Sequence, residues 1–120
     1  MTVRAVRGAT TVHTNTTDDI IKETTILLKN IVDYNNLNEE DIISIIFTVT
    51  NDINAAFPAK AAREIGFTKV ALMCMKEMEV PGSLEKCIRI LIHVNTDKSN
   101  DEIRHVYLNN AKILRPDLME

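Results

Sequence analysis

Apolar residues recur at helical spacing in one long stretch near the N-terminal end of the chain. Between Ile20 and Val32 they fall every three or four positions, and charged residues occupy the other side. This spacing puts the apolar side chains on one stripe of a helix. Residues 15–19 supply hydroxyl and acidic side chains that favour a helix start, and the pattern ends at 34–36. We therefore expect one long amphipathic helix, which can cover one face of a sheet.

Five other stretches carry the branched and apolar residues typical of strands. They span residues 3–7, 42–50, 69–75, 86–96 and 103–108. Gly8 is expected to close the first strand, and the branched residues of 42–50 favour a strand buried on both faces. The segment 57–66 predicts a short helix with Pro at its first position and Gly just beyond its end. The order β-α-β-α-β-β-β predicts an α+β or α/β domain with a single mixed β-sheet, and α+β is the class we expect.

One long helix covers only one face of such a sheet. The other face carries too many apolar residues to be left in water, because large exposed apolar patches usually mark contact surfaces. We therefore expect this face to pack against further copies of the chain in a small symmetric ring.

Length and composition narrow the class of protein. The 120 residues suffice for one modest core and show no repeat or linker, so we expect a single domain over residues 1–120. A net charge of −3, without a basic run, argues against nucleic acid as a partner. No apolar run approaches the roughly 20 residues that span a bilayer, which argues against a membrane partner. Two cysteines among apolar residues, without a hydrophobic leader, predict reduced thiols in a cytoplasmic protein.

Arg89 interrupts the apolar segment 87–94. A guanidinium is always charged, and burying it without a partner costs several kcal/mol or more, so apolar neighbours imply an anion close to it. In a strand, Arg89 shares a face with Cys87, Leu91 and His93, while the isoleucines between them face the other way. The anion is either an internal carboxylate, Glu77 or Glu79, or a bound ligand, and the spacing alone does not choose between them.

Signals for other chemistry are absent. Cys74 has no His near it in sequence and reads as a structural thiol. The three histidines have no metal-ligand spacing with the cysteines, and no phosphate- or dinucleotide-binding glycine motif occurs. We therefore expect neither metal nor cofactor. An enzyme of this kind would work by positioning and electrostatics.

Six segments resemble the AroH-class chorismate mutases in order and spacing, over nearly the whole chain from Val3 to Leu118. They are Arg7-Gly8-Ala9-Thr10-Thr11-Val12, Ala56-Phe57-Pro58-Ala59-Lys60-Ala61-Ala62-Arg63, Cys74-Met75-Lys76-Glu77-Met78, Cys87-Ile88-Arg89, Arg104-His105-Val106-Tyr107-Leu108 and Leu114-Arg115-Pro116-Asp117-Leu118. The resemblance implies a homotrimer of the pseudo-α/β-barrel type with active sites between subunits. It also implies an isomerase that converts chorismate to prephenate by a Claisen rearrangement, on the route to phenylalanine and tyrosine.

The resemblance further implies roles for individual residues. Arg89, Glu77 and Arg7 would be the catalytic group: Arg89 would donate to the ether oxygen of the substrate, and Glu77, with Cys74, would bind the ring hydroxyl. Arg7 and Tyr107 would hold the side-chain carboxylate. The remaining substrate-binding positions would be the wall and lining residues Phe57, Met73, Met75 and Lys76, and the residues of the entrance and C-terminal segment, Lys60, Arg63, Leu114 and Arg115. Met73 is bulky where some relatives are expected to carry a small hydroxyl residue.

Two other interpretations of the same residues stay open at this point. The first is a non-catalytic trimeric module that binds a small carboxylate at its subunit clefts, since fold resemblance alone does not establish chemistry. In the second the protein is purely structural, with Arg7, Arg89 and Glu77 closing on one another.

Overall fold

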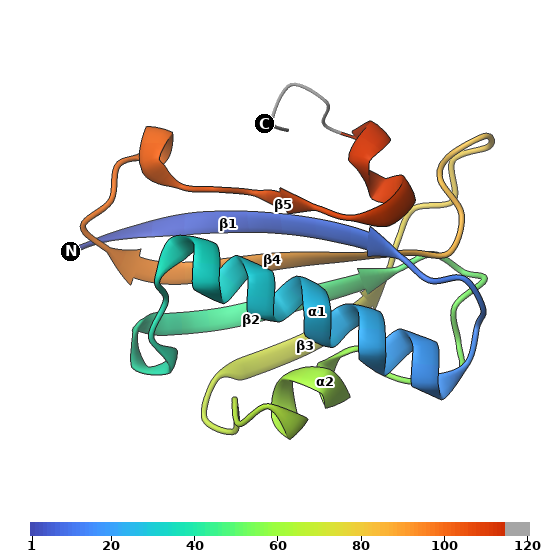
Figure 1. Cartoon of the computed structure of the whole chain (residues 1–120), viewed down its shortest axis with the longest axis horizontal. Helices are drawn as coiled ribbons and strands as arrows, with labels where there is room; N and C mark the ends of the chain where they lie inside the picture. Colours follow the sequence, from blue (N-terminus) through green and yellow to red (C-terminus); the bar gives the residue numbers. More distant parts are fainter. Residues whose placement is uncertain (115–120) are drawn as a thin grey trace.

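Five strands form one mixed sheet in the order β3-β2-β4-β1-β5 in a computed structural model that describes residues 1–114 (Figure 1). The strands are β1 (Thr2–Thr11), β2 (Ile42–Val49), β3 (Ala71–Lys76), β4 (Cys87–Thr96) and β5 (Val106–Tyr107). Strand β4 runs antiparallel to β1 and β2, whereas β3 is parallel to β2 and β5 is parallel to β1. The predicted element order and the mixed sheet are confirmed, although β5 is much shorter than the predicted 103–108.

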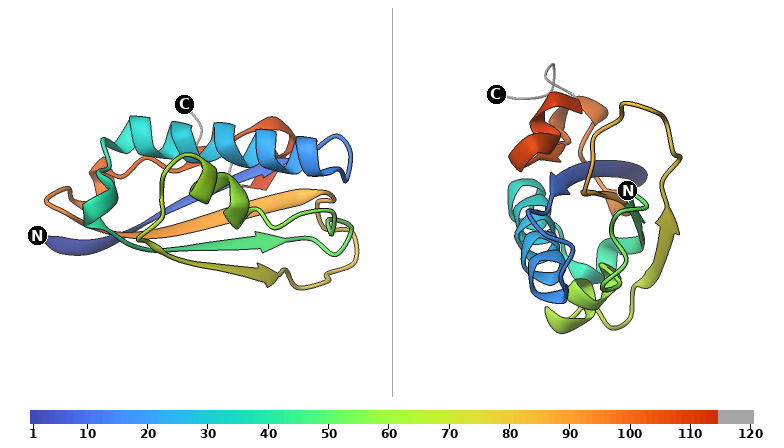
Figure 2. Two further views of the ribbon diagram at one scale, coloured as in Figure 1. Left: turned by 90° about the horizontal axis from the view of Figure 1, so that it is seen from below. Right: turned by 90° about the vertical axis from the view of Figure 1, so that its right-hand side faces the viewer.

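Both α-helices lie on the same side of the sheet, as Figure 2 shows in its left view. They are α1 (Thr17–Asn35) and the short α2 (Ala59–Glu64). Within residues 1–114, three 3-10 helices that were not predicted join or follow the strands: η1 (Glu39–Asp41), η2 (Asn100–Glu102) and η3 (Asn109–Leu114). We call the sheet face under α1 and α2 the helix-covered face and the opposite one the open face.

Helix α1 begins and ends where its sequence indicates. The side chain of Thr16 accepts a hydrogen bond from the backbone N–H of Asp19, and Asn36 ends the helix in the left-handed conformation with φ 51°. The buried stripe of α1 includes Leu27, Leu28 and Ile31. It packs on inward-facing strand residues of the main core, among them Val6, Ile45, Phe47, Ile90, Ile92 and Val94. Burying each such side chain stabilises the fold by about 1.5–3 kcal/mol.

Gly8 lies in the middle of β1, so the prediction that it closes the first strand is wrong. A Cβ atom at this position would come 2.6 Å from Cδ1 of Ile31 and 3.1 Å from Cδ1 of Leu27. The glycine is therefore a place where α1 approaches the strand closely, and it does not interrupt the ladder, which continues to Thr11.

The open face is less buried than the sequence predicts. Strand β4 alternates as expected, with Ile88, Ile90 and Ile92 fully covered on the helix side. On the open face, however, the Arg89 side chain is 46% exposed, which corrects the expectation of a buried guanidinium. Strand β2 is fully buried only on the helix-covered face, through Ile45 and Phe47, whereas Ile46 and Thr48 on the open face are half-buried. This corrects the expectation of a strand buried on both faces.

Side chains fasten the short strand β5 to the rest of the fold. The buried amide of Asn35 donates to the carbonyl of Arg104 at 2.9 Å and accepts from its N–H at 2.8 Å. Nδ1 of His105 accepts from the backbone N–H of Arg7 at 2.9 Å. These side-chain contacts supplement the short β1–β5 pairing and hold Tyr107 beside β1.

Helix η3 is fixed to β1 by Asn109, whose φ is 54°. Its amide donates to Oγ1 of Thr10 at 3.1 Å and to the carbonyl of Thr11 at 3.0 Å. This attachment holds η3 beside the end of β1, so that Leu114 at the end of the helix packs against the cluster that contains Tyr107.

Candidate active site

One row of side chains crosses the open face from edge to edge. Tyr107 on β5 is the register partner of Ala9 on β1, and Ala9 is that of Arg89 on β4. Arg89 is in turn opposite Thr48 on β2, and Thr48 is opposite Met75 on β3. Directly opposed residues of a sheet project to the same side. The row therefore places Arg89 in its middle, with the Tyr107 ring on one side and β3 on the other.

Glu77 follows directly after β3 and reaches Arg89 across β2. Its backbone N–H donates to the carbonyl of Val49 at 2.8 Å, which continues the β2–β3 pairing by one step. Oε2 of Glu77 lies 3.4 Å from Nε of Arg89. Of the anions that the sequence allowed for Arg89, the internal carboxylate of Glu77 is therefore present. Both side chains keep solvent contact, so an ion pair of this type stabilises the fold by about 1 kcal/mol or less.

The Glu77 carboxylate is held from two further directions. The hydroxyl of Thr48 donates to Oε2 at 3.0 Å, and the backbone N–H of Met78 donates to Oε1 at 3.2 Å. A carboxylate fixed in this way has a defined orientation on the open face. It can serve as a hydrogen-bond acceptor for a hydroxyl group.

Arg7 adds a second cation to the open face. It is exposed and lies opposite Leu91, so it shares the face of Arg89 on the neighbouring strand. Diagonal neighbours of this kind are about 7–8 Å apart in an antiparallel pair. Two guanidinium groups and one oriented carboxylate therefore lie together, a combination suited to a small dianion that also carries a hydroxyl.

Tyr107 belongs to a second, smaller core cluster that covers one end of the open face. The cluster consists of Ala9, Cys87, Tyr107 and Ala111, with Leu84 and Leu114 packed against it. Cys87, rather than Cys74, is the cysteine beside Arg89. Burial raises the pKa of the Cys87 thiol above its ordinary value, and the charge and hydrogen bond of Arg89 oppose that rise. The alternation of side chains along β4 already indicated that Cys87 is the neighbour of Arg89, because it puts residues 87 and 89 on one face.

Strand β3 divides its predicted site residues between the two faces. Met73 and Met75 lie on the open face. Cys74 pairs with the buried Phe47, and its side chain packs against the main core on the helix-covered face, away from Arg89. Lys76 is exposed and forms an ion pair with Glu79 at 3.0 Å. Since amides alternate along a strand and that of Glu77 points to β2, the main chain of Cys74 faces the free edge of β3.

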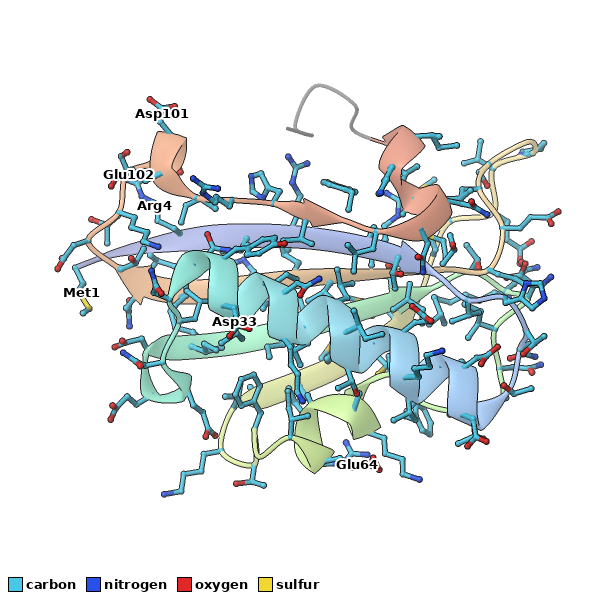
Figure 3. The ribbon with its side chains drawn as sticks, viewed as in Figure 1. Met1, Arg4, Asp33, Glu64, Asp101 and Glu102 are labelled. Atoms are coloured by element: carbon cyan, nitrogen blue, oxygen red, sulfur yellow. The ribbon has the colours of Figure 1, made fainter. Side chains whose placement is uncertain are left out.

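The residues predicted near α2 are not part of the row within one chain. Helix α2 packs on the helix-covered face through Ala59 and Ala62. Phe57, just before the helix, is 71% exposed. Lys60 and Arg63 are also exposed, and Nζ of Lys60 lies 4.0 Å from Oε2 of Glu64, which Figure 3 labels on the outer side of the helix. One further predicted residue, Arg115, lies outside the described residues.

Residues 1–114 contain no group of three or more His, Cys, Asp and Glu side chains placed to hold a metal ion. In the same range no helix combines the length and the apolar character that crossing a membrane requires.

Comparison with known proteins gives consistent matches along almost the entire chain. The family model "Chorismate mutase type I" matches residues 3–118. The chorismate mutase AroH of Bacillus subtilis is 46% identical over 119 residues, which cover 98% of this chain and 94% of that protein. The chorismate mutase AroH of Thermus thermophilus is 47% identical over 117 residues, covering 97% and 96%. The solved structure of a chorismate mutase from Clostridium thermocellum superposes with a TM-score of 0.91 at 64% identity, covering 92% of this chain and 98% of that one.

Proposed function

Because this chain belongs to the chorismate mutase type I family, we propose that its open face supplies the reacting half of the active site. The protein is a chorismate mutase, an isomerase that converts chorismate to prephenate in aromatic amino acid biosynthesis. We assign the chemistry to four residues, which we call the open-face cluster: Arg7, Glu77, Arg89 and Tyr107. The observation that carries the assignment is the meeting of Arg89 and Glu77 on the open face, near one end of the sheet.

The reaction needs charge stabilisation more than it needs a reactive side chain. The Claisen rearrangement breaks a C–O bond and forms a C–C bond in one pericyclic step, without a nucleophile or a proton transfer. The ether oxygen gains negative charge as the C–O bond lengthens. A guanidinium already aimed at that oxygen stabilises the transition state more than the ground state. Arg89 is assigned this task because it lies in the centre of the row, between Tyr107 and β3.

The other members of the cluster hold the substrate in its reactive shape. Glu77 accepts a hydrogen bond from the ring hydroxyl, and Arg7 and Tyr107 bind the side-chain carboxylate. Fixing both ends selects the compact conformer in which the two reacting carbons approach each other. The main chain of β3 at its free edge and the side chains of Met73 and Met75 form the wall beside the ring.

We infer that a second copy of the chain completes the site, within a homotrimer. Lys60 and Arg63 belong to α2, which packs on the helix-covered face, on the other side of the sheet from Arg89, and Phe57 just before this helix is exposed. The open face also exposes Met73 and Met75, which a neighbouring copy would cover. In such a ring the exposed residues near α2 of one copy face the open-face cluster of the next. Lys60 and Arg63 then make the entrance positive for a dianion.

The rest of the assignment follows from the same chemistry. We propose a single domain over residues 1–120 that works in the cytoplasm without metal or cofactor. Since no step requires a titrating group, turnover is expected to vary little with pH near neutrality.

The decisive experiment follows the loss of the diene absorbance of chorismate with purified wild-type protein and with Arg89→Ala. We expect Arg89→Ala to lose nearly all activity while its circular dichroism and its mass in solution stay those of the wild type. Arg4→Ala is the matched control, because Arg4 lies on β1 near the N-terminus (Figure 3) and its Nε donates to the carbonyl of Lys98. Near-normal turnover by Arg89→Ala would overturn the assignment.

A further inference from the structure

We propose that Thr48 is a positioning residue of the reaction, whose hydroxyl keeps Glu77 and Arg89 from closing on each other. The proposal rests on the function assigned to the open-face cluster. Thr48 lies on β2, between the strands that carry the two charged residues. It is the register partner of Arg89 on β4. On the other side its register partner is Met75 of β3, and Glu77 follows Met75 by two residues. Arg89 and Glu77 therefore approach each other across the side chain of Thr48.

The three side chains share a single oxygen atom. Oε2 of Glu77 accepts the hydroxyl of Thr48 at 3.0 Å, within the range of a good hydrogen bond. Nε of Arg89 lies 3.4 Å from that same oxygen, beyond the 2.7–3.2 Å typical of N–H···O bonds. The other carboxylate oxygen, Oε1, accepts from the N–H of Met78. The carboxylate is thus turned toward Thr48 and its own backbone, and its contact with the guanidinium is loose.

A carboxylate and a guanidinium that face each other freely prefer two parallel hydrogen bonds. Such bidentate pairs are markedly stronger than a single contact between the same groups. In that arrangement Arg89 would point at Glu77 instead of the ether oxygen, and Glu77 would no longer face the ring hydroxyl. The hydroxyl of Thr48 occupies the carboxylate and leaves each charged group aimed at a different part of the substrate.

The fold does not itself require a hydroxyl at this position. Thr48 is half-buried on the open face of a central strand, where a β-branched side chain packs well. Valine has the same shape and a similar strand preference, so only the hydroxyl distinguishes the two residues here. A purely structural account predicts that valine serves as well as threonine.

The test compares Thr48→Val, which removes the hydroxyl, with Thr48→Ser, which keeps it. We expect Thr48→Val to lower kcat about tenfold, the size expected for one hydrogen bond to a charged group, with a smaller rise in KM. Thr48→Ser should stay within about twofold of the wild type in kcat, for the same reason. Thr2→Val is the matched control, because Thr2 is an exposed strand residue at the other end of the sheet, opposite Thr96. Thermal unfolding of each variant reports its fold, and Thr48→Ala removes the same hydroxyl if Thr48→Val does not fold.

Kinetics in the Glu77→Ala variant distinguish this proposal from the assignment of the site. In Glu77→Ala there is no carboxylate to orient, so adding Thr48→Val should change kcat by less than about twofold. Wild-type kinetics in Thr48→Val, combined with a large loss in Glu77→Ala, would overturn the role of Thr48 and leave the site standing. Equal losses in Thr48→Val and Thr48→Ser would also overturn it. Full turnover by Glu77→Ala would instead remove the assigned function of Glu77.

Discussion

Arg89 and Glu77 come from opposite sides of β2, yet Nε of the first lies 3.4 Å from Oε2 of the second. With side chains 46% and 28% exposed, the pair is not a sealed internal salt bridge. Exposed pairs of this kind are weak, so the ether oxygen of the substrate can replace Glu77 as the partner of the guanidinium at little cost. The same geometry therefore agrees with Glu77 as the partner of Arg89 between turnovers and with the substrate as its partner during the reaction.

Replacing Arg89 with lysine should preserve the fold but not the activity. A lysine keeps the positive charge but has no planar fork of donors, so it cannot match the position of the developing oxyanion. We expect Arg89→Lys to lower kcat roughly 100-fold or more, the range seen when a preorganised donor is removed. The measurement is kcat for chorismate beside the thermal unfolding curve, with Arg4→Lys as the control. A loss of only a few fold would mean that charge alone is sufficient.

Mixing two defective variants tests the site between copies. Arg89→Ala damages the open-face cluster, and Arg63→Ala damages the residues near α2. If each site takes one group from each of two neighbouring chains, co-refolded mixtures contain some sites with neither change. Random assembly makes about a quarter of the sites intact in this way. The activity of the mixture should then exceed the average of the two separate variants.

The control for that experiment is a mixture of the same variants that are folded separately and not allowed to exchange. No gain in the co-refolded sample, despite mixed assemblies detected by mass spectrometry, would place both residues in the same chain's site.

Gly8→Ala should destabilise the fold through one specific contact. The new Cβ would lie 2.6 Å from Cδ1 of Ile31, and overpacking of this kind costs about 1–3 kcal/mol. Urea unfolding measures the change in the free energy of unfolding. Adding Ile31→Val removes that Cδ1 atom, so the double variant should recover part of the loss. A double variant that is less stable by the sum of both single effects would argue against the contact.

The buried thiol of Cys87 should make stability fall at alkaline pH. Its pKa is raised in the folded protein, chiefly by burial, so the folded state keeps a proton that the unfolded chain releases from about its ordinary value of 9.0 upward. The unfolded state then binds fewer protons, and the free energy of unfolding decreases as pH rises. We expect wild-type protein to lose stability more steeply than Cys87→Ala above pH 9 in denaturant titrations. Parallel curves for the two proteins would show that the thiol does not contribute.

Periodic patterns in the sequence predicted much of this fold correctly. The apolar stripe from Ile20 to Val32 located α1, and Thr16 and Asn36 mark its ends in the structure. The alternation around Arg89 correctly placed its neighbours on two faces. Such features are local, since each depends only on the spacing of residues a few positions apart.

Features that depend on contacts between distant segments were not accessible in the same way. Gly8 looks like a strand terminator, and only the approach of Ile31 from α1 explains it as a strand residue. The face of Cys74 is set by its register with Phe47, and the exposure of Arg89 by how far distant segments among residues 1–114 cover the open face. In each case the deciding contacts come from segments that lie far away in sequence.

The attachment of β5 has a consequence for the dynamics of that strand. Two ladder positions join it to β1, and side-chain amide and imidazole groups of Asn35 and His105 supply further bonds. Side-chain hydrogen bonds of this kind break without disturbing the central strands. Native-state hydrogen exchange should therefore show the amides of Val106–Tyr107 opening as a unit of low local stability, while those of β4 exchange only through global unfolding. The Tyr107 ring would then leave and rejoin the open-face cluster on its own timescale, independent of the central strand that carries Arg89.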